Sequence, residues 1–187
     1  GKWSTKDFSL ELSSSDSGSG IKHFQYKYTK DKKWEPYANS NKNKFTTTPF
    51  SAERNEPVYI QSCDNAGNCS QSSSTQIKIV KNVNVTYEIY YGNEETPTDS
   101  NKMIAQNGQI GGTVGKSLAI KNVKLSIDSV PKISGSIVYN GHRQTYGDSG
   151  NITAGNTMPT NSNGIKRMEK VRIWLTGDIA SAFDAYY

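Results

Sequence analysis

Short runs in which apolar and polar residues alternate constrain this chain more than any other feature of its sequence. The clearest run covers residues 83–91, where every second residue is valine, tyrosine or isoleucine. A period of two is the side-chain period of a half-buried β-strand, whereas a helix shows a period near 3.6. The other alternating runs lie at residues 8–12, 23–28, 44–50, 58–63, 76–80, 123–127 and 171–175. Clusters of turn-forming residues separate these runs, so the sequence predicts an all-β protein.

Composition and charge exclude several classes of protein. The 187 residues include 11 tyrosines against 5 phenylalanines, a balance that suits β-strands joined by polar turns. The net charge is +5, but the basic residues are scattered, so we expect no nucleic-acid partner. No apolar run approaches the length of a membrane-spanning helix, so we expect no membrane insertion in this fragment. The start of the chain, from Gly1 to Asp7, lacks an apolar signal core, so we expect the chain to begin downstream of any export signal.

The two cysteines, Cys63 and Cys69, lie in one short string and are separated only by turn-forming residues. If residues 58–63 form a strand that ends at this turn, Cys69 returns beside Cys63 within disulfide range. A disulfide favours an oxidising, extracellular location. The alternative is a metal site, but two thiolates with no nearby histidine supply only half of one. We therefore expect a disulfide, and we expect no metal.

The change in pattern near Lys81 and Asn82 predicts two domains, residues 1–81 and 82–187. The second domain contains an internal repeat, which aligns Tyr91 with Tyr139 and Tyr187, and Val123 with Val171. The same spacing aligns the strands at 123–127 and 171–175, and the turns at 107–110 and 149–152 are matched as well. We expect two copies, at about residues 87–135 and 136–187, that form a β-sandwich or a prism-like fold.

The first domain resembles a family of bacterial immunoglobulin-like domains found in long surface proteins. The resemblance rests on Trp3, residues 16–21, Tyr26, Trp34 and the stretch at residues 58–70. Its most specific part is the hairpin string Asp-Asn-Ala-Gly-Asn-Cys-Ser at residues 64–70, although the family does not generally carry the flanking cysteines. The resemblance implies an immunoglobulin-like β-sandwich that acts as a spacer or an adhesive domain.

The second domain resembles the clostridial hydrophobic repeat that carries a conserved tryptophan. Residues 164–177 match it most closely, and residues 111–117 match its Gly-Thr-Gly turn. The defining tryptophan is absent from both copies. The family is associated with Gram-positive surface proteins and with binding to cell walls, glycans or proteins, so the resemblance implies a non-catalytic binding role.

We find no recognisable catalytic motif in the sequence. Residues 111–117 look like a P-loop, but Ile110 stands where the motif needs glycine, and a β-like pattern follows where it needs a helix. His23 and His142 belong to no metal or nucleophile motif, so we expect surface histidines. Asp16 could offer oxygens to calcium, but an Asx turn explains the same residues. Glu94 and Glu95 lie in a loop with no apolar pocket. We therefore expect no enzyme activity and no cofactor.

Exposed aromatic side chains are the best indication of a ligand site, because sugar rings stack on aromatic faces. If the strand at residues 171–175 buries its odd-numbered residues, then Lys170, Arg172 and Trp174 share the opposite face. This places a tryptophan beside two cations. The alternative is that Trp174 packs against a neighbouring strand, loop or domain. Tyr90 and Tyr146 are further candidates.

We therefore expect a non-catalytic adhesion or ligand-binding fragment of a secreted or cell-wall-anchored Gram-positive protein. Its expected partners are a host glycan or glycoprotein and other surface proteins. Two alternatives remain open. The fragment could be a structural stalk with no ligand, or an accessory module of a large secreted enzyme.

Overall fold

The computed structural model of the protein describes residues 2–29, 31, 33–92, 99–159 and 166–187. The chain forms two compact units, Gly1–Lys81 and Asn82–Tyr187. Nearly all regular structure is β-strand, so the predicted all-β class is confirmed. The described residues contain no helix with the length and apolarity needed to cross a membrane.

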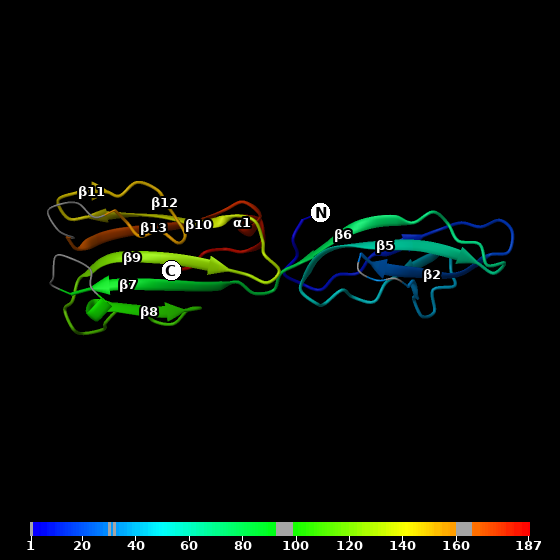
Figure 1. The fold of residues 1–187 in the computed structure, drawn as a ribbon, viewed down its shortest axis with the longest axis horizontal. Coiled ribbons are helices and arrows are strands. Elements are labelled where there is room, and N and C mark those ends of the chain that lie inside the picture. The colour runs from blue at the N-terminus through cyan, green and yellow to red at the C-terminus, as the bar shows by residue number, and fades with distance from the viewer. Residues whose placement is uncertain (1, 30, 32, 93–98, 160–165) are drawn as a thin grey trace. The chain divides into compact units, whose positions relative to one another are not determined.

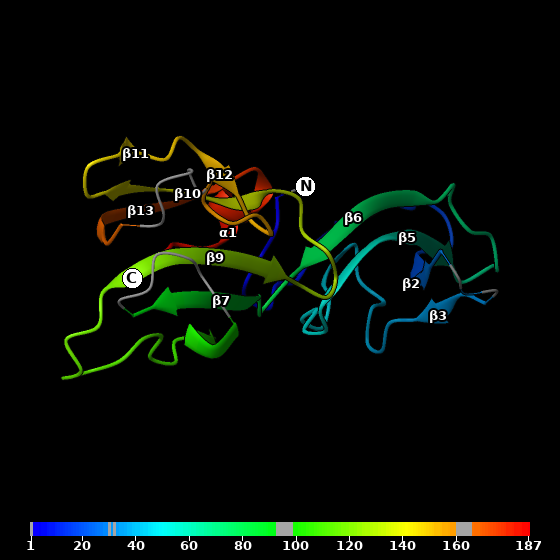
Figure 2. The ribbon, with the colours of Figure 1, turned by 60° about the vertical axis from the view of Figure 1, so that its left-hand side comes forward.

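The first unit contains an antiparallel sheet in the order β3-β2-β5-β6, whose strands are labelled in Figure 2. Strands β1 and β4 form a separate pair. Its core is lined by Val58, Ile77 and Ile79, which are all fully buried, and by Phe24 at 3% exposure. Two clusters of apolar side chains form this core. The strands are β1 (Glu11–Ser13), β2 (Ile21–Tyr28), β3 (Glu35–Pro36), β4 (Lys44–Thr46), β5 (Arg54–Asp64) and β6 (Ser73–Ile79).

Strand β4 is shorter than the alternation at residues 44–50 predicts. Thr47 donates its N–H to the carbonyl of Leu10 and accepts the N–H of Leu10 on its hydroxyl. Pro49 has no N–H to continue the ladder. Pairing resumes only at Phe50, which forms a single bridge to Phe8. The alternation holds for half-buried Phe45 and buried Thr47, but a side-chain hydrogen bond and a proline end the strand early.

Strand β5 extends beyond its predicted start and includes Pro57. Pro57 lies opposite Gln76 of β6. Two residues further along β6, the carbonyl of Lys78 accepts a bond from Ser4, which lies on the side of β6 away from β5. The backbone groups of every second residue pair, including Pro57–Gln76, therefore point out of the β5–β6 ladder. The missing N–H of Pro57 therefore faces the β2 side, where β2 has already ended opposite Val58. Proline is tolerated here because no partner needs its proton.

The hairpin turn after β5 carries the predicted disulfide between Cys63 and Cys69, whose Cα atoms are 4.0 Å apart. Asp64 stabilises the turn by accepting bonds from the backbone and side-chain amide groups of Asn68, at 2.8 and 3.0 Å. These bonds hold the pKa of the Asp64 carboxyl below its ordinary value, and the bond from the Asn68 side chain has the larger effect.

The second unit contains two antiparallel sheets, which Figures 1 and 2 show as separate layers. One has the order β8-β7-β9. The other is centred on β10, which pairs with β13 on one side and with β11 and β12 on the other. The elements are β7 (Asn84–Tyr91), η1 (Asp99–Asn101), β8 (Lys102–Gln106), β9 (Ile120–Asp128), β10 (Ser136–Arg143), β11 (Gly147–Asp148), β12 (Ile152–Thr153), β13 (Met168–Thr176) and α1 (Asp178–Ala182).

Side chains from both sheets bury a single core. Tyr139 of β10 is fully buried, and its hydroxyl donates to the carbonyl of Asn156 and accepts the N–H of Leu125 from the other sheet. The apolar residues that form this core are Ile89, Val123, Leu125, Ile137, Tyr139, Ile152 and Met158, with partly buried neighbours around them.

The segment at residues 154–158, which follows β12, crosses to the other sheet and pairs with β9. Gly155 donates its N–H to the carbonyl of Leu125 at 2.7 Å, and Thr157 forms a bridge with Lys124. The side chain of Asn122 donates to the carbonyl of Met158 at 3.1 Å. This segment therefore joins the two sheets through backbone hydrogen bonds.

The strand ladders do not repeat as the tyrosine spacing predicted. In the β10–β13 ladder Tyr139 faces Ile173, and in the β7–β9 ladder Tyr87 faces Leu125. The position of Tyr139 is therefore that of Tyr87, and the predicted match with Tyr91 is wrong. The spacing of the tyrosines and the spacing of β9 and β13 therefore cannot both mark equivalent positions.

The predicted alignment of the turns also fails. Ile110 is 76% exposed in a loop after β8, whereas Ile152 is 7% exposed in β12. Strand β7 begins at Asn84, so a copy that begins at residue 87 would divide it. The predicted copy boundary and the predicted turn alignment therefore do not match the strands of the structure.

Comparison of the two ladders explains why a glycine, Gly141, stands in the middle of β10. Gly141 faces Val171, as Ile89 faces Val123 in the other sheet. Met158, which is 1% exposed, fills the space of the missing side chain. A Cβ atom on Gly141 would lie 2.8 Å from the Met158 Cε atom, so no larger residue fits without displacing it.

Candidate functional site

The outward face of the β10–β13 pair carries three of the predicted site residues. Val171, Ile173 and Leu175 pack against the core, so Lys170, Arg172 and Trp174 lie on the opposite side of β13. We call this surface the β13 face; it comprises Lys170, Arg172 and Trp174 with their partners on β10, which are His142, Asn140 and Val138.

The degree of burial along β13 only partly follows the sequence prediction. Lys170 and Arg172 are exposed, whereas Trp174 is half-buried. Val171 and Ile173 are also half-buried, so burial class does not separate them from Trp174. The difference lies in their contacts, because only the aliphatic pair belongs to the core cluster.

The β13 face consists of three cross-strand pairs, which differ in polarity and charge. Trp174 lies opposite Val138, which makes one end of the face apolar. Arg172 lies opposite Asn140, whose side-chain amide donates to the Asn151 side chain at 3.2 Å. The face therefore changes from an aromatic and aliphatic row to an amide row beside a guanidinium.

The third row places Lys170 opposite His142, whose ring lies 2.9 Å from the Asp148 carboxylate. The nearby Glu169 is bonded to Arg167 at 3.0 Å. Within the part of the chain that the structure describes, the side chains of Lys170 and Arg172 make no hydrogen bond or ion pair. Two positive charges therefore remain without a counter-ion there.

The other predicted residues lie elsewhere. Tyr90 is in β7, on the outward side of the three-stranded sheet, and its hydroxyl donates to Glu88 at 3.3 Å. Burial, followed by the negative charge of Glu88, raises the pKa of the Tyr90 hydroxyl. Tyr146 lies in the turn between β10 and β11 and is half-buried. Neither tyrosine shares the β13 face with Trp174, so the predicted set falls in three places.

A charged cluster surrounds Tyr90. Glu88 lies between two lysines, with its carboxylate 2.8 Å from Lys124 Nζ and 3.8 Å from Lys102 Nζ. The hydrogen bond from Lys124 is the main reason that the pKa of the Glu88 carboxyl is lowered. Glu88 neutralises the charge of Lys124 within the protein, which favours a structural role for this pair.

A groove of about 370 Å³ in the first unit was not predicted from the sequence. It opens where the core ends along β6. Ile77 and Ile79 are fully buried, whereas Thr75 and Ser73, at the preceding inward positions of the strand, are exposed. The lining residues are Leu10, Glu11, Leu12, Ser13, Ser14, Phe24, Ile60, Gln61, Ser62, Ser70, Gln71, Ser73, Ser74 and Thr75.

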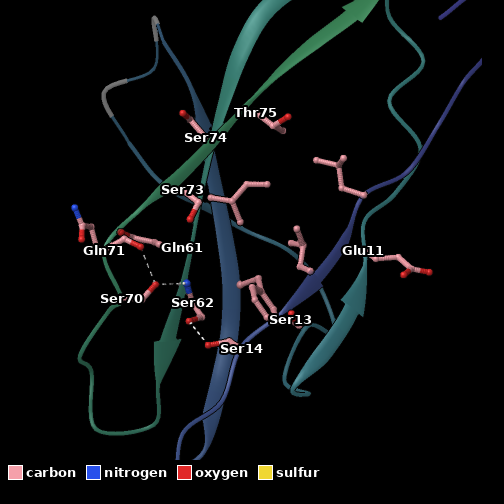
Figure 3. A pocket seen from close by; sticks show the side chains of 14 residues that line it. Glu11, Ser13, Ser14, Gln61, Ser62, Ser70, Gln71, Ser73, Ser74 and Thr75 are labelled. Atoms are coloured by element: carbon pink, nitrogen blue, oxygen red, sulfur yellow. Dashed lines mark hydrogen bonds between the residues drawn. The ribbon is translucent and has the colours of Figure 1, made fainter. Parts of the chain in front are cut away.

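Hydroxyl groups surround the groove, as Figure 3 shows. Ser14 and Ser62 lie 2.8 Å apart through their hydroxyl oxygens, and the N–H of Ser62 donates to the Ser70 hydroxyl at 3.1 Å. The aromatic ring of the lining, Phe24, is only 3% exposed. The groove therefore lacks the open aromatic face on which a sugar would stack. The signal that could have revealed it is the pair of hydroxyl residues at the inward positions of β6.

The remaining sequence expectations concern metals and nucleotides. Asp16 accepts the N–H groups of Gly18 and Gly20 at 3.0 and 2.5 Å, which is the turn predicted as the alternative to calcium. The described residues contain no group of three or more potential metal ligands among His, Cys, Asp and Glu. A strand, β9, follows the P-loop-like string at residues 111–117. Glu94 and Glu95 lie outside the described residues.

Comparison of the chain with protein-family models, curated proteins and solved structures found no match.

Proposed function

We propose that this chain is a non-catalytic ligand-binding fragment of a secreted or wall-anchored bacterial surface protein, and that the β13 face binds a host glycan or glycoprotein. The observation that carries the proposal is Trp174, which lies on the outward side of a sheet beside Arg172, a cation with no counter-ion among the described residues. Tryptophan and arginine contribute disproportionately to binding energy at interfaces.

The proposal includes the architecture and location implied by the two resemblances. The first unit is an immunoglobulin-like sandwich that presents the second, and the second is a repeat with a binding face on one of its two sheets. The Cys63–Cys69 disulfide supports an extracellular location, because such bonds persist in oxidising compartments.

The test measures binding of the intact chain to an array of mammalian glycans and glycoproteins, with Trp174→Ala as the variant. Loss of a central stacking aromatic costs about 2 kcal/mol or more, which is about thirtyfold in affinity. Trp34, which is half-buried in the first unit under the Lys27 ammonium, provides the matched tryptophan control. The Trp34→Ala variant should retain binding.

Thermal melts of the same variants separate binding from folding. Trp174→Ala should cost folding about 1 kcal/mol, typical of a partly exposed position. A loss of several kcal/mol would show that Trp174 is a core residue and would remove the proposed site. A wild-type chain that binds nothing on the array would favour a stalk, and the flanking sequence would identify an accessory module of an enzyme.

A further inference from the structure

The ladders allow the outward faces of the two sheets in the second unit to be compared position by position. Lys124 of β9 faces Glu88 of β7, and Arg172 of β13 faces Asn140 of β10. These pairs occupy equivalent places, since each lies one residue from the paired Tyr87–Leu125 or Tyr139–Ile173. Where the first sheet places a carboxylate opposite its cation, the second sheet places a neutral amide.

This single replacement decides whether the cation on the neighbouring strand has a counter-ion. Lys124 is bound to Glu88 at 2.8 Å, and so its charge is neutralised within the protein. The Arg172 guanidinium is exposed and makes no ion pair with the described residues. Guanidinium binds carboxylate and sulfate groups through two parallel hydrogen bonds, a geometry that ammonium cannot provide.

The next equivalent position adds an apolar platform. Ser126 faces Thr86 in the three-stranded sheet, whereas Trp174 faces Val138 in the other. Residues two apart on a strand are separated by about 7 Å, so Trp174 and Arg172 are close enough to contact one or two adjacent sugar units. The ring offers stacking to a sugar face, and the guanidinium offers a partner for an acidic substituent.

We propose that the β13 face selects sugar chains that carry carboxylate or sulfate groups, with the acidic group at Arg172, a sugar ring on Trp174 and Lys170 as a second cationic contact. This inference rests on the proposed function and specifies its ligand class. Charge complementarity supports it, because the two cations lack counter-ions in the described part of the chain. A glycan fits better than an acidic protein or a nucleic acid because the face combines one stacking ring with the neutral amide of Asn140, which is bonded to Asn151.

The decisive variant restores the carboxylate that the other sheet has. Asn140→Glu places an acid opposite Arg172, and Asn140→Gln is its neutral control of the same size. Binding of the intact chain is measured by calorimetry to three probes: a heparin hexasaccharide for sulfate, 3′-sialyllactose for carboxylate, and lactose as the neutral arm. The wild type should bind at least one acidic probe and bind lactose at least tenfold more weakly.

The Asn140→Glu variant should weaken acidic binding about tenfold or more, since hydrogen bonds to charged groups are the strong ones. The Asn140→Gln variant should stay within about threefold of the wild type. Arg172→Gln, at an exposed position, repeats the charge test where folding is least at risk. Equal binding by Asn140→Glu and Asn140→Gln, or by Arg172→Gln and the wild type, would overturn the inference.

Other outcomes distinguish this inference from the proposed function. Lactose bound as tightly as the acidic probes, with a loss in Trp174→Ala, would overturn the acidic preference and leave glycan binding intact. Acidic binding that Trp174→Ala does not change would overturn both. A short DNA duplex bound more tightly than the acidic sugars would replace the glycan by a nucleic acid. Absence of binding to any probe would also refute the inference.

Discussion

In the three-stranded sheet of the second unit, Lys124 faces Glu88 and the two charges cancel, whereas in the four-stranded sheet Arg172 faces Asn140 and keeps its charge. Both pairs stand at equivalent places in ladders built around a tyrosine of the central strand. The inward positions are constrained because the sheets share one core. The outward positions carry no such constraint, so one face can become a binding surface while the other remains structural.

The largest expected difference between the two sheets is the loss of stability when the tyrosine of the central strand is removed. Tyr139 is fully buried, whereas Tyr87 is half-buried, although they hold equivalent places. Tyr139→Ala should destabilise the second unit by about 4 kcal/mol, the cost of deleting a large buried ring, and Tyr87→Ala should cost about half of that. Urea denaturation of both variants measures the difference. Equal losses would mean that the two sheets contribute to the core equally.

The charged cluster supplies a second test, which depends on pH. The Lys124 hydrogen bond lowers the pKa of Glu88 below its ordinary 4.5 in the folded protein. The ionised carboxylate therefore stabilises the fold above pH 4.5, and this contribution is lost as the pH falls through the folded pKa. At pH 7, Glu88→Gln should cost about 1 kcal/mol, the upper range for a partly exposed pair.

The stability difference between Glu88→Gln and the wild type should shrink as the pH falls below 4.5. Glu169→Gln is the matched control, because the Glu169–Arg167 pair is more exposed, with side chains at 37% and 58%. It should change stability little at any pH. A Glu88→Gln difference that persists at low pH would point to packing instead of charge.

The smallest effect comes from rebuilding the neutralised pair on the other sheet. Asn140→Glu should raise the stability of the second unit by about 0.5 kcal/mol through a new pair with Arg172, and high salt should remove the gain. Asn140→Gln should give no gain. Thermal melts at low and high salt check both variants. A salt-independent loss in Asn140→Glu would show that the bond between Asn140 and Asn151 matters more than charge.

The sequence predicted strands such as β7, β9 and β13 because the period of two records which face of each strand is buried, but it predicted no strand at β10, where Gly141 and Arg143 stand at inward positions. The same period placed Trp174, Arg172 and Lys170 on one face of one strand. It did not predict which residues oppose them, because register depends on pairing between strands separated by loops of different length. The even spacing of the tyrosines misled for that reason, since Tyr139 holds the place of Tyr87.

Other features were not predicted because a single strand does not reveal them. The pairing of Glu88 with Lys124 connects strands β7 and β9, which lie far apart along the chain. The groove beside β6 depends on Ser73 and Thr75, which look like ordinary turn residues until the strand is known to include them. The hairpin turn with its disulfide was easier to predict, because the two cysteines and the turn between them lie within residues 63–69.

The segment at residues 154–158 is hydrogen-bonded to strands of both sheets. Its bonds to Leu125, Lys124 and Asn122 mean that β9 completes its outer edge only when this later part of the chain has folded. Separation of the two sheets would break the bond of Ala154 to Ile137 or the bond of Gly155 to Leu125. The two halves of the second unit should therefore exchange their amide hydrogens with solvent as one group, although their ladders are separate.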